Sequence, residues 1–220
     1  GDLDRRLHFL TMVVEAISPG ATDDRQGATF STSTTLPELY ALDGRAPRKL
    51  THRNQALQAE VAFVAAEDLT STSKDGTEVH AVLLKPVGYV AGRRYPLVLY
   101  LHGGPNGQDD HSFFAVHQWL AANGYLVLAP NYRGSSGRGA AHQKAIHNDW
   151  GRFEVVDVLG AVDEVVKQGL ADPERLGIGG WSYGGITTNY TIASDSRFKA
   201  AVSGAGSSLQ LTMYGTDQYV

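Results

Sequence analysis

The sequence predicts an α/β fold with a mostly parallel sheet, preceded by an antiparallel β segment. Three observations support this prediction. Short alternating runs separated by turn residues fill the first 60 residues, strands alternate with helices after them, and a serine stands in a strand-to-helix turn. At 220 residues the chain is long enough for one ordinary domain and a smaller unit. We therefore expect a remnant of a larger β domain at residues 1–60 and an α/β domain at residues 61–220.

The antiparallel segment is predicted from two alternating runs, 28–34 and 38–42, and from the Asp43-Gly44 pair that follows them. An Asp-Gly pair favours a hairpin because glycine adopts positive φ without strain. Residues 49–51 are then the returning strand. Strands and a turn at this spacing are typical of a propeller blade, and such a unit cannot bury a core alone.

The α/β domain is predicted from apolar strands that alternate with helices. Strands are expected at residues 61–65, 78–84, 96–102, 125–130, 176–180 and 200–203, and helices at residues 113–123, 153–168 and 184–193. Such alternation predicts a mostly parallel sheet with right-handed crossovers. Continuous apolar character further predicts that 96–101, 125–129 and 176–180 are neighbouring parallel strands with helices on both faces of the sheet.

Composition and charge argue against several classes of function. The net charge is −4 at pH 7 and the pI is near 6.0, whereas nucleic-acid binding requires a basic surface. No apolar run approaches the roughly 20 residues that span a bilayer, and no signal peptide follows Gly1. The absence of cysteine removes disulfides and thiolate nucleophiles, and it leaves both the cytosol and the periplasm open.

No cofactor or metal is expected from the motifs of the chain. The glycine-rich residues 131–139 fit neither the dinucleotide-binding motif nor the P-loop, and residues 177–182 lack the third glycine of the former. The histidines at positions 111, 117, 142 and 147 do not have the spacing of a metal site on a helix.

The strongest functional signal is the sequence Gly180-Trp181-Ser182-Tyr183-Gly184, which matches G-x-S-x-G. A predicted strand precedes it and a predicted helix follows it, as in the nucleophile turn of the α/β-hydrolase fold. Such a turn is crowded, so only small side chains fit at its two flanking positions. We therefore predict that Ser182 is a nucleophile with a positive φ. The alternative is a glycine-rich turn with a buried serine.

A second signal is the sequence His102-Gly103-Gly104 at the end of an apolar strand. A glycine loop in this position can direct backbone N–H groups at an oxyanion, although a simple tight turn is the alternative. We expect His102 to support this loop rather than to act as a base. We also expect Asp157 to be structural, either favoured by the helix dipole or holding a neighbouring loop.

Four motifs occur in one order along the chain: LHGGP (101–105), NYRGSSGRG (131–139), W-G-x-F-E-x-x-D (150–157) and GWSYGG (180–185). In order and spacing they resemble the prolyl oligopeptidase family of serine peptidases, particularly its dipeptidyl-peptidase and acylaminoacyl-peptidase branches. The resemblance covers about residues 60–220 and implies an α/β-hydrolase fold. The segments PELYALDG (37–44) and KLTHRN (49–54) are similar to the end of that family's β-propeller.

The resemblance implies that Ser182 is the nucleophile and that the backbone N–H groups of Gly104 and Tyr183 form an oxyanion hole. In the dipeptidyl-peptidase branch a tyrosine stands at the position of His102, which leaves the second donor open. Tyr214 is similar to a residue that borders the pocket for the residue before the scissile bond. Oligopeptides are the implied substrates. The alternatives are an esterase on the same fold and a hydrolase-like binding module without catalysis.

The chain departs from the family pattern after Ser182. The last histidine is His147, and the acids that follow Ser182 are Asp195 and Asp217. In this fold the Asp and His of the triad follow the serine, so they are not present in this chain. We therefore expect a chain that is truncated at both ends, an incomplete hydrolase domain with an exposed sheet edge and an uncovered apolar face, and little activity from these residues alone.

Overall fold

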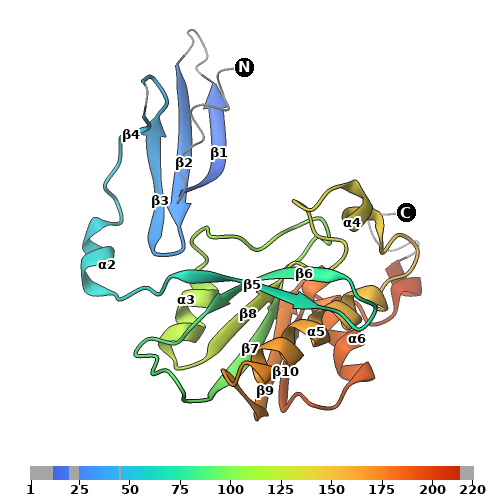
Figure 1. Cartoon of the computed structure of the whole chain (residues 1–220). Helices are drawn as coiled ribbons and strands as arrows, with labels where there is room; N and C mark the ends of the chain where they lie inside the picture. Colours follow the sequence, from blue (N-terminus) through green and yellow to red (C-terminus); the bar gives the residue numbers. More distant parts are fainter. Residues whose placement is uncertain (1–11, 20–24, 45, 214–220) are drawn as a thin grey trace.

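The computed structural model describes residues 12–19, 25–44 and 46–213, which form two sheets (Figure 1). The first is antiparallel throughout, in the order β1-β2-β3-β4. Its strands are β1 (Val13–Pro19), β2 (Gln26–Thr32), β3 (Thr35–Ala41) and β4 (Arg48–Lys49). The antiparallel segment is therefore confirmed, with the Asp43-Gly44 pair between β3 and β4. Strand β1 has no counterpart among the strands expected from the sequence.

The second sheet has six strands in the order β10-β9-β7-β8-β6-β5. They are β5 (Ala66–Thr72), β6 (Glu78–Leu84), β7 (Tyr95–Leu101), β8 (Leu126–Pro130), β9 (Ala171–Trp181) and β10 (Ala200–Gly204). The helices are α2 (Gln55–Glu60), α3 (Ala115–Ala122), α4 (Ala140–Lys144), α5 (Phe153–Lys167), α6 (Tyr183–Ser194) and the 3-10 helix η1 (Gln210–Met213). None of the helices that the structure describes combines the length and apolar character needed to cross a membrane.

The predicted parallel core of the sheet is confirmed. Strand β7 pairs in parallel with β8 on one side and β9 on the other, and β10 pairs in parallel with β9. Strands β6 and β5 continue the sheet in antiparallel fashion beyond β8. The predicted strand at residues 61–65 is wrong. In the described structure α2 ends just before these residues, which pair with no strand, and β5 begins at Ala66.

Helices lie on both faces of the sheet, where two buried clusters form. The odd-numbered leucines of β7 (Leu97, Leu99 and Leu101) pack in one buried cluster with Val158 of α5 and Ile186 of α6. On the opposite face, a second cluster joins residues of α3, β6 and β8, namely Val82, Leu84, Ala121, Val127 and Ala129. Helix α3 therefore covers the β6–β8 half of that face.

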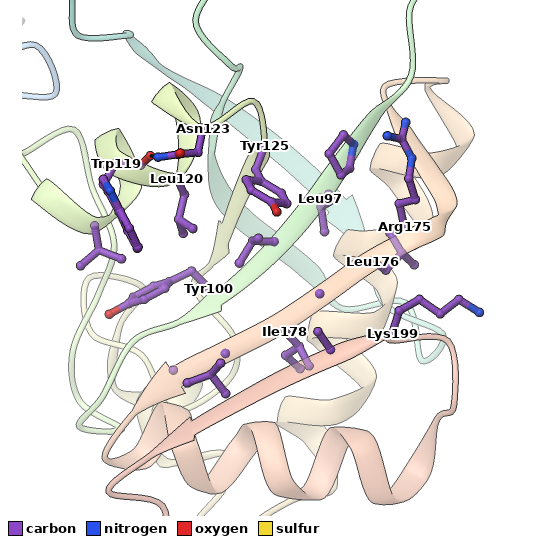
Figure 2. A pocket seen from close by; sticks show the side chains of 18 of the residues that line it. Leu97, Tyr100, Trp119, Leu120, Asn123, Tyr125, Arg175, Leu176, Ile178 and Lys199 are labelled. Carbon is purple, nitrogen blue, oxygen red and sulfur yellow. Dashed lines mark hydrogen bonds between the residues drawn. The ribbon is translucent and has the colours of Figure 1, made fainter. Parts of the chain in front are cut away.

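The other half of this face is open. Pro96, Val98 and Tyr100, the even-numbered residues of β7, line a groove of about 900 Å³ that extends across β9 to β10. Trp119 and Leu120 of α3 border it in Figure 2. The expectation of helices on both faces is therefore wrong for β7 in the described residues, whereas the expected uncovered apolar face is found there. Strand β10 is the outermost strand, and its Val202 is 72% exposed.

Direct hydrogen bonds tie the antiparallel sheet to α3 and the loop before it. The Nε2 of Gln118 donates to the backbone oxygen of Ser33 (2.7 Å), and the backbone N–H of Phe113 donates to Ser31 Oγ (3.0 Å). The N–H of Ala66, the first residue of β5, donates to Ser33 Oγ (3.0 Å). The boundary near residue 60, with residues 1–60 and 61–220 as separate units, remains a proposal.

Candidate active site

Ser182 is the single residue between β9 and α6, at the carboxyl edge of the parallel strands. Its backbone has φ 57° and ψ −120°, and its side chain is exposed. The predicted positive φ is therefore confirmed. A non-glycine residue in such a conformation costs on the order of 1–3 kcal/mol and persists where the surroundings impose it. Here the N–H of Ser182 donates to Gly204 O (2.8 Å), and its carbonyl accepts from Ile186 N–H (3.0 Å).

The two flanking glycines are required because the turn presses against β7. A Cβ added at either Gly180 or Gly184 would overlap the backbone oxygen of Leu101. That oxygen belongs to the strand that carries the neighbouring glycine loop. Close packing of the turn on β7 therefore fixes the position of Ser182 relative to this loop.

We expect Gly184→Ala to lower the free energy of unfolding by about 1–3 kcal/mol, because its methyl group forces α6 away from β7. The measurement is urea denaturation. Gly177→Ala is the matched control, since a Cβ at Gly177 of β9 meets its neighbours at ordinary distances of 3.7 Å or more. Equal effects of the two substitutions would contradict the packing argument.

The glycine loop after β7 lies against Ser182. A Cβ added at Gly103 would lie 3.9 Å from Ser182 Oγ and 3.1 Å from Trp181 O. Standard covalent geometry then places the nitrogen of Gly104 within about 8 Å of that hydroxyl oxygen. Tyr183 is the first residue of α6, so its N–H has no partner within the helix. Gly104 and Tyr183 are thus both near Ser182.

His102 is buried, and both of its ring nitrogens are engaged in the loop. Its Nδ1 lies 2.8 Å from Gly103 O and its Nε2 lies 2.8 Å from Ser135 Oγ. Its ring stacks on Tyr132 at 4.5 Å, and the Tyr132 hydroxyl donates to His102 O (2.6 Å). Burial lowers the pKa of His102, which favours the neutral ring. These contacts support the loop, as the sequence predicts.

Glu154 fixes the ring of Tyr183 through the Tyr183 hydroxyl. The sequence did not predict this contact. The Tyr183 hydroxyl donates to a buried Glu154 carboxyl oxygen, and the N–H of Gly151 lies 3.2 Å from both oxygens of that group. The ring of Trp150 meets Tyr183 edge-on at 5.1 Å. Burial raises the pKa of Glu154. These contacts fix the position of Tyr183, whose backbone N–H lies next to Ser182.

Asp157 holds the loop after β8, one of the two roles that the sequence suggested. Its carboxylate accepts from the backbone N–H of Arg133 (2.8 Å), from Arg133 Nη2 (2.7 Å) and from Ser73 Oγ (2.6 Å). Arg133 also donates from Nη1 to Asp75 (2.6 Å) and lies over the ring of Phe153. The loop is thereby anchored to α5 and to the β5–β6 turn.

The Asp75–Arg133 pair predicts a loss of stability in acid. The hydrogen bond from Arg133 lowers the pKa of Asp75 from 3.8 to about 2. A carboxyl whose pKa is lower in the folded state stabilises that state above its unfolded pKa, and the contribution disappears as the pH falls from about 4 to about 2. We expect the Tm of Asp75→Asn to fall less than that of the unmodified chain between pH 5 and pH 2. Asp68→Asn is the surface control, and parallel loss in all three proteins would contradict this account.

Three residues named from the sequence lie after Ser182, namely Asp195, Tyr214 and Asp217. Tyr214 lies outside the described residues, as does Asp217. Asp195 follows α6 and binds Arg197, with one oxygen 3.0 Å from Nη2 and the other accepting the backbone N–H at 2.9 Å. The described structure therefore gives Asp195 a partner on its own loop.

Comparisons with known proteins agree with these observations. Residues 111–220 match the prolyl oligopeptidase family. The chain is 37% identical over 192 residues to the uncharacterized peptidase YuxL of Bacillus subtilis, covering 84% of this chain and 29% of that protein. It is 31% identical to dipeptidyl-peptidase 5 of Porphyromonas endodontalis, with coverages of 93% and 32%.

A solved structure is also similar. An acylaminoacyl peptidase in complex with Z-Gly-Gly-Phe-chloromethyl ketone superposes with a TM-score of 0.84 and 30% identity, covering 93% of this chain and 32% of that one. The chain thus spans about a third of the length of the proteins that it matches. The likeness includes both sheets, because it extends over nearly the whole chain.

Proposed function

Because the chain belongs to the prolyl oligopeptidase family, we propose that it carries the nucleophile of a serine peptidase, Ser182, in an α/β-hydrolase domain that begins near residue 61. The observation that carries this proposal is the exposed Ser182 with positive φ beside the Gly103-Gly104 loop. In a peptidase of this kind the Oγ attacks the carbonyl carbon of the scissile bond. The hydroxyl proton passes to a base and then to the leaving amine, and water hydrolyses the acyl-enzyme.

The oxyanion of this reaction would be bound by the N–H groups of Gly104 and Tyr183. Such donors stabilise the charge that develops on the carbonyl oxygen in the transition state. The contact of Glu154 with the Tyr183 hydroxyl and the support of the loop by His102 favour a fixed geometry for both donors. Preorganised donors need no rearrangement during the reaction, which is what makes them effective.

The triad Asp and His, which would activate Ser182, have no counterpart among the residues described above. No histidine follows Ser182 in the 220 residues, and the ring nitrogens of His102 are engaged elsewhere. The matched proteins are about three times as long as this chain. We therefore propose that the triad Asp and His lie outside the 220 residues and that these residues alone are a poor catalyst.

Oligopeptides are the proposed substrates. The names of the similar proteins support this, since they include a dipeptidyl-peptidase and an acylaminoacyl peptidase solved with a peptide-derived chloromethyl ketone. The antiparallel sheet of β1–β4 fits a proposed propeller unit, which would restrict access to short peptides. Whether the substrate has a free or an acylated amino terminus depends on the protein residues that bind this terminus.

The test is hydrolysis of matched substrates by the full-length protein. Short peptidyl anilides and the corresponding esters, each with a free or an acetylated amino terminus, are compared by kcat/KM. We expect cleavage of the anilides, with the preferred amino terminus separating dipeptidyl from acylaminoacyl activity. Cleavage of esters alone would make the protein an esterase. No turnover of either class would support a binding module and overturn the proposal.

A further inference from the structure

Two Asn-Gly pairs occur in the 220 residues, Asn106-Gly107 and Asn123-Gly124. In such a pair the backbone nitrogen of the glycine can attack the asparagine side chain, because glycine has no Cβ to block the approach and its backbone is flexible. The first pair lies in the glycine loop that follows β7, and the second lies at the end of α3. The surroundings of each pair decide whether this attack can occur.

The side chain of Asn106 is exposed and forms no hydrogen bond with the described residues. The backbone around it is held by the loop after β8. The Ser136 hydroxyl donates to the backbone oxygen of Asn106, and the Ser136 N–H donates to Gly107 O (2.9 Å). No hydrogen bond therefore has to break before the Asn106 carboxamide turns toward the backbone nitrogen that follows it.

Asn123 is exposed as well, but its side chain and the nitrogen after it are both engaged. Its Nδ2 donates to Trp119 O at 2.8 Å (Figure 2). The N–H of Gly124 donates to Ala121 O (3.1 Å). Both bonds must break before the Gly124 nitrogen attacks the side chain, and each such bond lowers the reactive population by roughly a factor of 5. The second pair is therefore protected by the end of its helix.

We propose that Asn106 is a site of spontaneous deamidation. The backbone nitrogen of Gly107 loses its proton and bonds to Cγ of Asn106, and the side-chain amide takes up a proton and leaves as ammonia. Water then opens the cyclic succinimide that this step forms. Cleavage of the bond between the nitrogen and Cγ gives aspartate. Cleavage of the bond between the nitrogen and the main-chain carbonyl carbon gives isoaspartate, in which the main chain runs through Cγ.

Isoaspartate lengthens the main chain by one methylene group at a point where the glycine loop is tightly packed. A Cβ added at Gly107 would lie only 2.6 Å from Gly103 O. One added at Gly104 would lie 2.4 Å from the nitrogen of Asn106 and 2.6 Å from that of Gly107. Gly103 itself packs against Ser182. The added methylene group therefore displaces the loop that carries a proposed oxyanion donor, and the resulting loss of activity rests on the proposed function.

The test maps deamidation in the full-length protein during incubation at mildly alkaline pH, which favours loss of the amide proton. The protein is digested, and mass spectrometry follows the peptides that contain the two pairs, with fragmentation that distinguishes isoaspartate from aspartate. We expect Asn106 to convert about 10- to 100-fold faster than Asn123, the matched control, because two hydrogen bonds protect the latter. A rate at Asn106 that does not exceed the rate at Asn123 would overturn the inference.

Peptide hydrolysis then measures the effect on the loop. The kcat/KM of the unmodified protein should fall in proportion to the isoaspartate formed at position 106. Asn106→Gln, which closes the ring far less readily, should keep its kcat/KM throughout, and fresh Asn106→Asp should match the unmodified protein because it adds the charge without the methylene group. Constant kcat/KM as isoaspartate accumulates would contradict the effect on the loop. If the fresh protein cleaves no peptide, the proposed function fails, whereas the mapping still decides the modification site.

Discussion

Replacing Ser182 by alanine is expected to lower kcat for peptide hydrolysis by about 10⁴- to 10⁶-fold in the full-length protein. The substitution removes the only atom proposed to form the acyl bond, and the two N–H donors that remain stabilise an oxyanion without a nucleophile. The fold should be unaffected, because Ser182 contributes its backbone to the turn and its side chain is exposed.

The control for this prediction is Ser194, the last residue of α6, the helix that follows Ser182. Ser194 is exposed and its hydroxyl donates to Tyr190 O, so Ser194→Ala should retain kcat within about twofold. Steady-state kinetics on a peptidyl anilide measures both variants. Residual turnover above about 1% in Ser182→Ala would show that another group carries the reaction.

The largest expected effect on stability comes from Asp157→Ala. The side chain of Asp157 is fully buried, and its loss removes the acceptor of Arg133 Nη2, of the Arg133 backbone N–H and of the Ser73 hydroxyl. Removing one partner of a buried ion pair typically costs about 3–5 kcal/mol. We expect a loss of this size in the free energy of unfolding, measured by urea denaturation of the domain that contains α5.

An exposed ion pair on the same helix provides the comparison. Asp163 of α5 pairs with Arg197 and is half exposed, so Asp163→Ala should cost no more than about 1 kcal/mol. A similar small loss in Asp157→Ala would mean that the loop after β8 is held by other contacts. Asp157 would then be an early-turn acid that the helix dipole favours.

The fold was predictable from the sequence wherever burial sets the pattern. Strand 78–84 matches β6 residue for residue, and the three apolar runs proved to be neighbouring parallel strands. The strand prediction for residues 61–65 failed because a short apolar run shows the same pattern whether or not a partner strand lies beside it. An uncovered apolar face was expected, but the sequence did not place it on β7, since apolar residues do not reveal whether a helix covers them.

The candidate site was predictable only in its local part. Ser182 and its flanking glycines obey a local backbone constraint, which leaves a motif in the sequence. The contact between Glu154 and Tyr183, by contrast, joins residues 29 positions apart. Tertiary packing alone brings these groups together.

The most direct measurement of the central claim is to map the adduct of a fluorophosphonate probe, which reacts with activated serines. The full-length protein is treated with the probe, digested and analysed by mass spectrometry. We predict that the adduct lies on the peptide containing Ser182, that Ser182→Ala loses it, and that the 220 residues alone react weakly for want of a base. An adduct on another serine, with Ser182 unmodified, would contradict the assignment of the nucleophile. Strong labelling of Ser182 in the 220 residues alone would show that they contain the proton acceptor.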